Sequence, residues 1–362
     1  MLISHLKKID WLLVSLAVFL TSIGLLEIYN ICSQEGNFLN FKKQLIFFIL
    51  GLFLIILFSF FDYRILRTNS YLVLSLYILA LVSLIGLFFL GTEMRGVKGW
   101  YNFGSFSFDP VPFMAVILIV VLSKYFSRYH VEIYRFRHIF FSGIYVLMPA
   151  VLIFLQPDLG STLILIFLWV GIVILSGVKL SHFLILILVF SLIFIISWAF
   201  ILKDYQKQRF ISFLNPQIDE MGISWNINQS KIAIGSGGLL GKGIGKGSQS
   251  QYGFLPEAHT DFIFSALAEE TGLLGVSVLF FVFLILLFKI IKIALNSKNN
   301  FVRLFASGFA FLLFSQIFIN IGMSLGLLPI VGISLPLVSY GGSQLLALYS
   351  GLGLLQSMKI NA

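Results

Sequence analysis

The sequence has few charged residues and almost no cysteine. Only 11% of its 362 residues are Asp, Glu, Lys or Arg, and fifteen are acidic. The single cysteine, Cys32, excludes an internal disulfide. So little polar sequence excludes a large water-soluble domain. The basic residues are scattered over many segments instead of forming one patch, so the sequence does not indicate a nucleic-acid-binding protein.

Apolar residues dominate instead, at 59% of the chain with a mean hydropathy of +1.01. Soluble domains are usually nearer about 45–50% apolar. Repeated apolar runs of about 20 residues are typical of membrane helices, whose backbone groups are all paired internally. The pattern predicts an all-α polytopic membrane protein forming one domain over residues 1–362. Ten spans are predicted, near 11–31, 44–62, 70–91, 110–126, 139–156, 159–177, 182–202, 261–290, 304–325 and 343–358.

The distribution of Lys and Arg predicts the orientation. With the N-terminus in the cytoplasm, the inner side holds fourteen of them, and the short outer loops hold four (Lys42, Lys43, Arg95 and Lys98). Basic residues favour cytoplasmic loops, so we expect both termini to be cytoplasmic and the loops at 92–110 and 203–260, the latter between spans 7 and 8, to be extracytoplasmic. No cleavage signal follows Lys7 and Lys8, so the first span is expected to be retained.

A glycine-rich stretch, "GSGGLLGKGIGKG", occupies residues 235–247 and contains Lys242 and Lys246. Glycine-rich loops with lysines can surround phosphate oxygens with backbone N–H groups. The stretch lacks the ending of a nucleotide-binding P-loop. A flexible hinge or close helix packing is the alternative explanation.

The next stretch, "LPEAHTDF", places Glu257, His259, Thr260 and Asp261 directly before an apolar run. Thr260 or Asp261 can cap the following helix, and a carboxylate at a helix end can also do chemistry. A divalent cation is possible, although the spacing matches no zinc motif; no metal ligands and no certain cofactor are assigned.

Glu269 and Glu270 follow within the same apolar run, and a charge at mid-bilayer costs roughly 3 kcal/mol. Either the helix lines a wet cavity, or residues 262–271 lie at the membrane interface and 272–288 form the span alone.

Four stretches resemble the SEDS family (shape, elongation, division and sporulation proteins): residues 41–66, "QPDLGST" at 156–162, residues 229–275 and "GLLPIVGISLPLVSYGGSQLL" at 326–346. The resemblance covers nearly the whole chain and fits ten spans with both ends inside. It implies a peptidoglycan glycosyltransferase that polymerises lipid II in the bacterial inner membrane, with a class B penicillin-binding protein as partner. "GSQSQYGFLPEAHTDF" resembles the RodA-like elongation branch more than the FtsW-like division branch.

The resemblance also assigns site residues. Asp261 is implied as the catalytic general base toward a sugar hydroxyl, a role typically worth about 10²–10⁴-fold in rate. Glu257, His259 and Thr260 are expected to position the acceptor or Asp261. Trp100 is expected to stack on a sugar or to anchor the loop at the interface. The candidate cations for the lipid-linked pyrophosphate are Arg95, Lys98, Arg209, Lys231, Lys242 and Lys246.

The sequence departs from the family pattern at three positions. Gly99, Pro112 and Ala115 stand where members usually carry Arg, Glu and Lys. Lys98 can replace the arginine, and Asp109 offers a nearby carboxylate. The departures leave open altered substrate handling, or a weakly active or non-catalytic member that serves as a scaffold for the penicillin-binding partner. A lipid II flippase is a further alternative, because charged residues lie near the spans.

Overall fold

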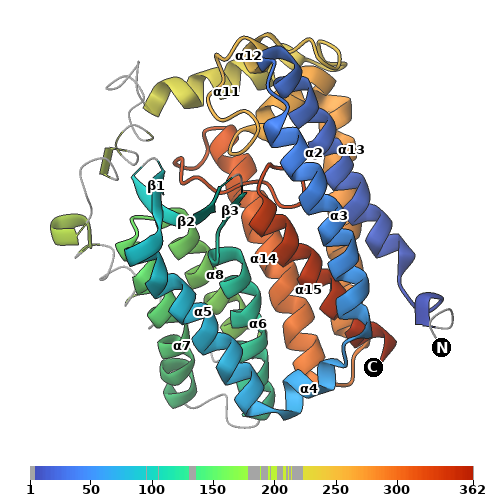
Figure 1. Ribbon diagram of the computed structural model, residues 1–362, viewed down its shortest axis with the longest axis vertical. Helices are drawn as coiled ribbons and strands as arrows, with labels where there is room; N and C mark the ends of the chain where they lie inside the picture. Colours follow the sequence, from blue (N-terminus) through green and yellow to red (C-terminus); the bar gives the residue numbers. More distant parts are fainter. Residues whose placement is uncertain are drawn as a thin grey trace.

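The computed structural model describes residues 5–94, 96–104, 106–129, 136–177 and 223–361, and a few residues between 178 and 222. Long helices run side by side through the molecule, with the sheet, α11 and α12 at one end and α4 and both termini toward the other (Figure 1). The long helices are α2 (Trp11–Glu35), α3 (Leu39–Phe60), α5 (Ser70–Leu90), α6 (Val111–Arg128), α7 (Phe136–Leu155), α8 (Leu159–Leu175), α13 (Ile263–Asn296), α14 (Asn300–Ser324) and α15 (Gly342–Ile360). The short ones are α4 (Tyr63–Thr68), α11 (Ile223–Gly237) and α12 (Ser248–Gln251).

These helices confirm a mostly helical, multi-pass membrane protein. Among the described residues, seven helices are long and apolar enough to cross a bilayer, and α8 is a shorter apolar helix. Nine of the ten predicted spans coincide with a long helix. The remaining predicted span, 182–202, falls largely outside the described residues, where only the π-helix η2 (Ser197–Ile201) is assigned.

The outer loop at 92–110 adds a small sheet to the predicted all-helical chain. Strands β1 (Thr92–Met94), β2 (Val97–Phe103) and β3 (Phe106–Phe108) pair antiparallel in the order β1-β2-β3. The β1–β2 and β2–β3 turns contain Gly96 and Gly104, whose φ angles of 80° and 63° favour glycine. The hydroxyl of Tyr101 donates to the carbonyl of Ser83 at 2.5 Å, which holds the sheet against α5.

The predicted span at 261–290 is two helical segments joined at an elbow. Gly272, inside α13, has φ 65° and ψ −165°, far from helical values. Residues 263–270 before it are all buried, while the segment after it is long enough to span the membrane. This arrangement agrees with the predicted division of the run into a short entry segment and a separate span.

The glycine-rich stretch pairs the backbone groups that the elbow leaves open. The N–H groups of Lys242 and Gly243 donate to the carbonyls of Glu269 and Glu270, each at 3.0 Å. In return, Leu273 and Leu274 donate to the carbonyls of Gly238 and Leu239, at 2.9 and 3.2 Å. An unpaired backbone group within a membrane protein costs several kcal/mol. Close packing is therefore a demonstrated role of this stretch, as the alternative explanation predicted.

Candidate functional site

The turn that carries Asp261 is held by its own backbone. The N–H groups of Thr260 and Phe262 both donate to the carbonyl of Glu257, at 3.0 and 3.3 Å. The Thr260 hydroxyl donates to the Glu257 carboxylate at 3.0 Å. Glu257 has φ 52°, an uncommon angle for a residue with a side chain, and such angles concentrate at functional sites. The structure thus brings together the polar residues predicted from "LPEAHTDF".

Asp261 is not the N-cap residue of α13. That residue is Phe262, whose side chain makes no capping hydrogen bond. The carboxylate faces the loop between α14 and α15, where a Cβ at Gly332 would lie 3.7 Å from Asp261 Oδ2.

Three successive carbonyls anchor the Asp261 turn to the C-terminal part of the chain. The carbonyl of His259 accepts from the N–H of Tyr340 at 2.9 Å, and that of Thr260 accepts from the Ser339 hydroxyl at 2.6 Å. The carbonyl of Asp261 accepts from the Asn320 amide at 2.9 Å. The His259 ring also meets the Tyr340 ring edge-on, with centroids 5.7 Å apart. The turn is therefore fixed by α14 and by the loop that follows it.

Sequence reasoning did not identify these anchors. Asn320 is a fully buried amide in an apolar membrane helix, a signal that could have marked it. It also donates to the carbonyl of Ile333 at 2.8 Å, so one side chain joins α14 to both loops. Gln44 of α3 braces the same loop by bonding the carbonyl of Ser339 and the N–H of Gly341, both at 3.2 Å.

Asp109 joins the sheet to the start of α15. Its N–H donates to the hydroxyl of Ser343 at 2.8 Å, and its carboxylate accepts from the N–H of Val111 at 2.9 Å. Burial raises the pKa of Asp109 to about 7, with a further contribution from the negative charge of Asp158 and an opposing one from the Val111 N–H. This carboxyl is consequently poised to change charge near neutral pH.

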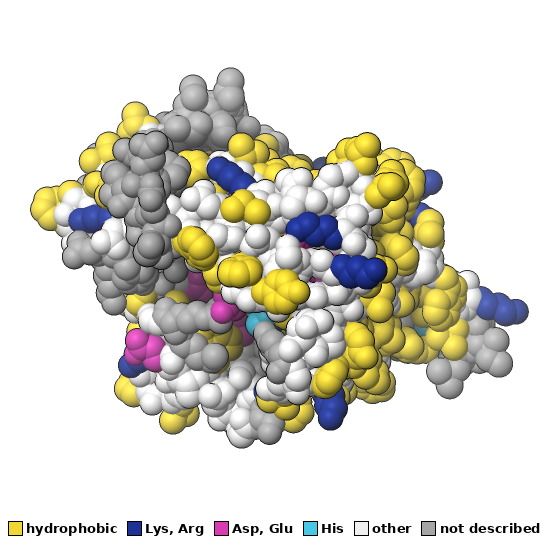
Figure 2. Space-filling view, turned by 90° about the horizontal axis from the view of Figure 1, so that it is seen from above, with side chains coloured by type: hydrophobic (Ala, Val, Ile, Leu, Met, Phe, Trp, Pro, Cys, Tyr) yellow, Lys and Arg dark blue, Asp and Glu magenta, His cyan; other side chains and the backbone are white. Residues whose placement is uncertain are grey.

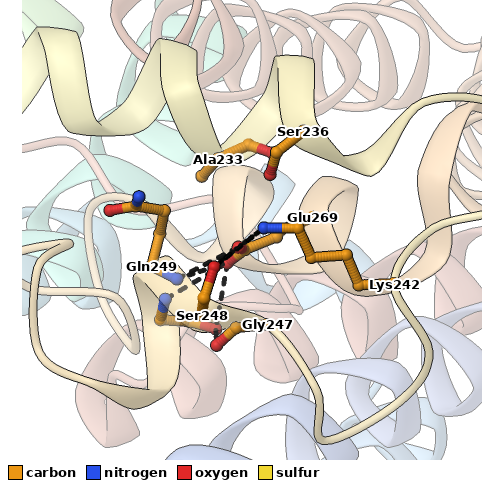
Figure 3. A network of polar contacts seen from close by, with 8 residues as sticks. Ala233, Ser236, Lys242, Gly247, Ser248, Gln249 and Glu269 are labelled. Carbon is orange, nitrogen blue, oxygen red and sulfur yellow. Dashed lines mark hydrogen bonds and ion pairs between the residues drawn. The ribbon is translucent and has the colours of Figure 1, made fainter.

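The predicted cations differ in their surroundings. Lys242 forms an ion pair of 2.7 Å with Glu269, within a set of contacts that includes Ser248 and Gln249 (Figure 3). Lys231 lies on α11 beside Gly326, in the loop after α14, and Lys246 is exposed. Arg95 and Arg209 lie outside the described residues. Seen from this end, acidic side chains gather beside a histidine near the centre of the face, with Lys or Arg side chains nearby (Figure 2).

The Lys242 pair explains one of the two glutamates in the apolar run, since Glu269 is neutralised. Glu270 accepts hydrogen bonds from the Asn30 amide at 3.0 Å and the Gly245 N–H at 2.8 Å.

Among the described residues, no group of His, Cys, Asp and Glu has an arrangement able to hold a metal ion.

Lys98 and Gly99, the position where family members usually carry an arginine, lie on opposite faces of strand β2. Lys98 is exposed and Gly99 is buried, as expected for neighbours on opposite faces of a strand. Lys98 therefore does not point where an Arg at position 99 would point, contrary to the suggestion that it replaces that arginine. Trp100 is partly buried, and its carbonyl accepts from the Thr92 hydroxyl at 3.1 Å.

The other two departures lie at the start of α6. Pro112 is in the first turn, where proline is favoured, and Ala115 is buried in the core. A charged side chain at position 115 would be enclosed by the helix bundle.

Comparison with known proteins decides the family. A family model described as "Cell cycle protein", covering FtsW, RodA and SpoVE, matches residues 6–362. The chain belongs to this family. It is 37% identical over 283 residues to the peptidoglycan glycosyltransferase MrdB of Escherichia coli K12, covering 78% of this chain and 76% of MrdB. It is 36% identical over 286 residues to the probable peptidoglycan glycosyltransferase FtsW of Haemophilus influenzae, covering 78% of this chain and 72% of that protein.

Solved structures of the family share the fold. A chain of a peptidoglycan synthase complex, described as coordinating polymerisation and crosslinking, superposes with a TM-score of 0.81 at 30% identity, covering 98% of both chains. The rod-shape-determining protein RodA of Thermus thermophilus superposes with a TM-score of 0.70 at 29% identity, covering 97% of this chain and 96% of RodA. With its membrane helices, this family member is a multi-pass protein of the bacterial inner membrane.

Proposed function

We propose that this protein is a peptidoglycan glycosyltransferase that polymerises lipid II at the outer face of the cytoplasmic membrane. The observation that carries the proposal is the anchoring of Asp261. Its backbone carbonyl and those of the two preceding residues are bonded to Asn320, Ser339 and Tyr340, and its carboxylate faces the loop between α14 and α15. A side chain held in this way is positioned for chemistry, since catalysis depends on small displacements.

In the proposed reaction Asp261 acts as a general base. It takes the proton of the acceptor sugar hydroxyl, whose oxygen forms a bond to the anomeric carbon of the donor. The bond between that carbon and the lipid pyrophosphate breaks, and the pyrophosphate leaves with the bonding electrons. Because the leaving group needs no proton, one carboxylate suffices.

The surrounding residues have supporting roles in this proposal. Glu257, Thr260 and His259 position Asp261 or the acceptor. Lys231 and Lys246, on the same stretch of chain as the glycine-rich loop, stabilise the charge that develops on the pyrophosphate. Lys242 contributes less, because its ammonium is already paired with Glu269. The end of the bundle that carries the Asp261 turn faces outward under the predicted topology, in which the short loops of that side hold few Lys and Arg residues.

The proposed partner is a class B penicillin-binding protein, which would crosslink the new strands. The likeness to a chain of a synthase complex that coordinates polymerisation and crosslinking supports this choice.

The motif "GSQSQYGFLPEAHTDF" favours an elongation role over a division role. The test is complementation. Rescue of rod shape in cells depleted of their RodA-like protein, without rescue of division in cells depleted of FtsW, would support that assignment.

The decisive experiment compares Asp261→Asn with the unaltered protein in polymerisation of labelled lipid II, with and without the partner. Asn keeps the volume of the side chain, so we expect a folded, partner-binding protein with polymerisation reduced at least ~10²-fold. The matched control is Asp62→Asn, which alters the cap of α4. Normal polymerisation by Asp261→Asn would overturn the assignment, and an unaltered protein that binds its partner but makes no glycan would favour the scaffold function.

A further inference from the structure

A cavity of about 650 Å³ opens at the end of the bundle opposite Asp261. Its lining residues come from the α4–α5 junction, the end of α6 and the start of α14. These helix ends lie at the same end of the bundle (Figure 1). Its lining consists of Arg67, Thr68, Ser70, Lys124, Ser127, Arg128, Lys298, Asn299 and Asn300. This basic cavity holds four cationic side chains and no carboxylate in its lining. Its volume suits a small polar group, since ligand sites usually measure about 300–1,000 Å³.

The four cations are not neutralised within the described part of the chain. Lys124 donates to the carbonyl of Leu66 at 3.0 Å, and the Arg128 guanidinium lies 5.9 Å from the centroid of the Tyr129 ring. None of the ion pairs between described residues includes Arg67, Lys124, Arg128 or Lys298. Like charges gathered around one cavity repel each other, and a bound anion would relieve that repulsion.

A second basic cluster at the same end shows the contrast. There Asp10 accepts from Lys359 at 2.7 Å and lies 3.5 Å from Lys289, beside a cavity of about 330 Å³. Two of the cations in that cluster therefore share a carboxylate. The general excess of basic residues in cytoplasmic loops accounts for positive charge at this end, but it does not account for four cations from three separate elements around one cavity.

Backbone groups add to the attraction for anions. Helices α5 and α14 begin at the cavity, at Ser70 and Asn300, so the positive ends of two long helices meet there. Phosphate groups bind well where helix N-termini and basic side chains coincide. The side chains and the two helix ends together favour a phosphate over a singly charged halide.

The position of the basic cavity indicates the source of the phosphate. Helix α5 leaves its rim and exposes Tyr71, Leu74 and Ile78 at 86%, 48% and 49%, on one side of a membrane helix. Such a stripe can contact acyl chains while the cavity holds the group attached to them. Basic pockets between membrane helices on the cytoplasmic side are suited to anionic lipid headgroups.

We propose that the basic cavity binds the phosphate-bearing headgroup of an anionic phospholipid of the inner leaflet. The choice of leaflet follows from the orientation in the proposed function, but the binding chemistry does not depend on Asp261. A headgroup bound in the cavity would contact the start of α5, the end of α6 and the start of α14, and would hold these three helix ends together. Because α14 also carries Asn320, the headgroup would stabilise the helix that supports the Asp261 turn.

The test measures lipid retention by native mass spectrometry. Purified protein is mixed with phosphatidylglycerol, with zwitterionic phosphatidylcholine, or with inorganic phosphate as a soluble competitor. We expect phosphatidylglycerol to bind at least ~10-fold more tightly than phosphatidylcholine, and millimolar phosphate not to displace it. The test variant combines Arg67→Gln, Arg128→Gln and Lys298→Gln. At ~1 kcal/mol per basic residue near a lipid surface, its affinity for phosphatidylglycerol should fall about 100-fold.

The matched control removes three exposed charges elsewhere at this end, through Lys7→Gln, Lys8→Gln and Lys292→Gln. It should retain phosphatidylglycerol like the unaltered protein, and thermal melting of both variants checks their folding. Equal loss in the two variants would overturn the proposal, because binding would then reflect overall charge. Displacement by phosphate alone would also overturn it, in favour of a soluble anion, and so would displacement by an acidic peptide. Asp261→Asn should bind the lipid normally, so failure of polymerisation and failure of lipid binding are distinguishable.

Discussion

The ammonium of Lys242 lies 2.7 Å from the carboxylate of Glu269, and the pair locks the glycine-rich stretch against the elbow of α13. The Glu269 side chain is fully buried, and Lys242 is 30% exposed. The carboxylate also accepts from the N–H group of Gln249 at 3.0 Å (Figure 3) and from that of Ser250 at 3.2 Å, so its charge is well compensated. Lys242 therefore has a structural role as the counter-ion of Glu269, independent of any substrate.

Replacing Lys242 by Met should destabilise the fold more than it weakens substrate binding. The change leaves Glu269 buried without its counter-ion, which costs roughly 2–4 kcal/mol, less than for a wholly buried pair because Lys242 is partly exposed. Thermal melting in detergent measures this loss. Lys246→Met is the control, since Lys246 is exposed and should lower the melting temperature little. Unchanged melting with weaker lipid II binding in Lys242→Met would show that Lys242 serves the substrate instead.

Gly272→Ala should disrupt the elbow of α13. With φ 65° the position is strained for any side chain, and a Cβ there would overlap the backbone of Leu239 and Gly241. We expect a loss of several kcal/mol, seen as poor membrane insertion or a lower melting temperature. Gly235→Ala is the matched control, because a Cβ in that part of α11 meets nothing within 4 Å. Equal behaviour of the two variants would contradict the role given to the elbow.

Asp109 should make stability depend on pH. The pKa of Asp109 is about 7 in the folded protein and 3.8 ordinarily. Between these two pH values the folded state holds a proton that the unfolded chain has already released. Stability should therefore fall as pH rises from about 4 to about 7, and then level off. Melting of Asp109→Asn at pH 5 and pH 8 should show a smaller decrease than the unaltered protein, with Asp62→Asn as the control. An identical decrease in Asp109→Asn would exclude Asp109 as its source.

The predicted topology can be tested by cysteine labelling in a Cys32→Ser background. Lys246→Cys should react with a membrane-impermeant maleimide in intact cells, and Lys298→Cys should react only after permeabilisation, because short-loop basic residues remain in the cytoplasm. Both positions are exposed, so access to the reagent is comparable. Labelling at 298 but not at 246 in intact cells would reverse the orientation.

Hydropathy alone determined most of the fold. Apolar runs of span length leave the chain little choice, because a bilayer requires internal pairing of backbone groups. The motif around Asp261 could also be recognised, since Glu257, His259, Thr260 and Asp261 are neighbours in the sequence and share one turn. The division of residues 261–290 at Gly272 could also be predicted from the sequence, because the seventeen-residue run 272–288 is long enough to span the membrane by itself.

Tertiary structure decided which groups hold that turn and what neutralises the buried charge. Ser339 reaches Thr260 across 79 positions, and Asn320 reaches Asp261 across 59. The pairing of Lys242 with Glu269, and the gathering of Arg67, Arg128 and Lys298 around one cavity, likewise depend on how the helices pack. Local sequence specifies where a helix begins and how apolar it is. Contacts between distant segments follow from the shapes of all the helices together, so only the folded chain reveals them.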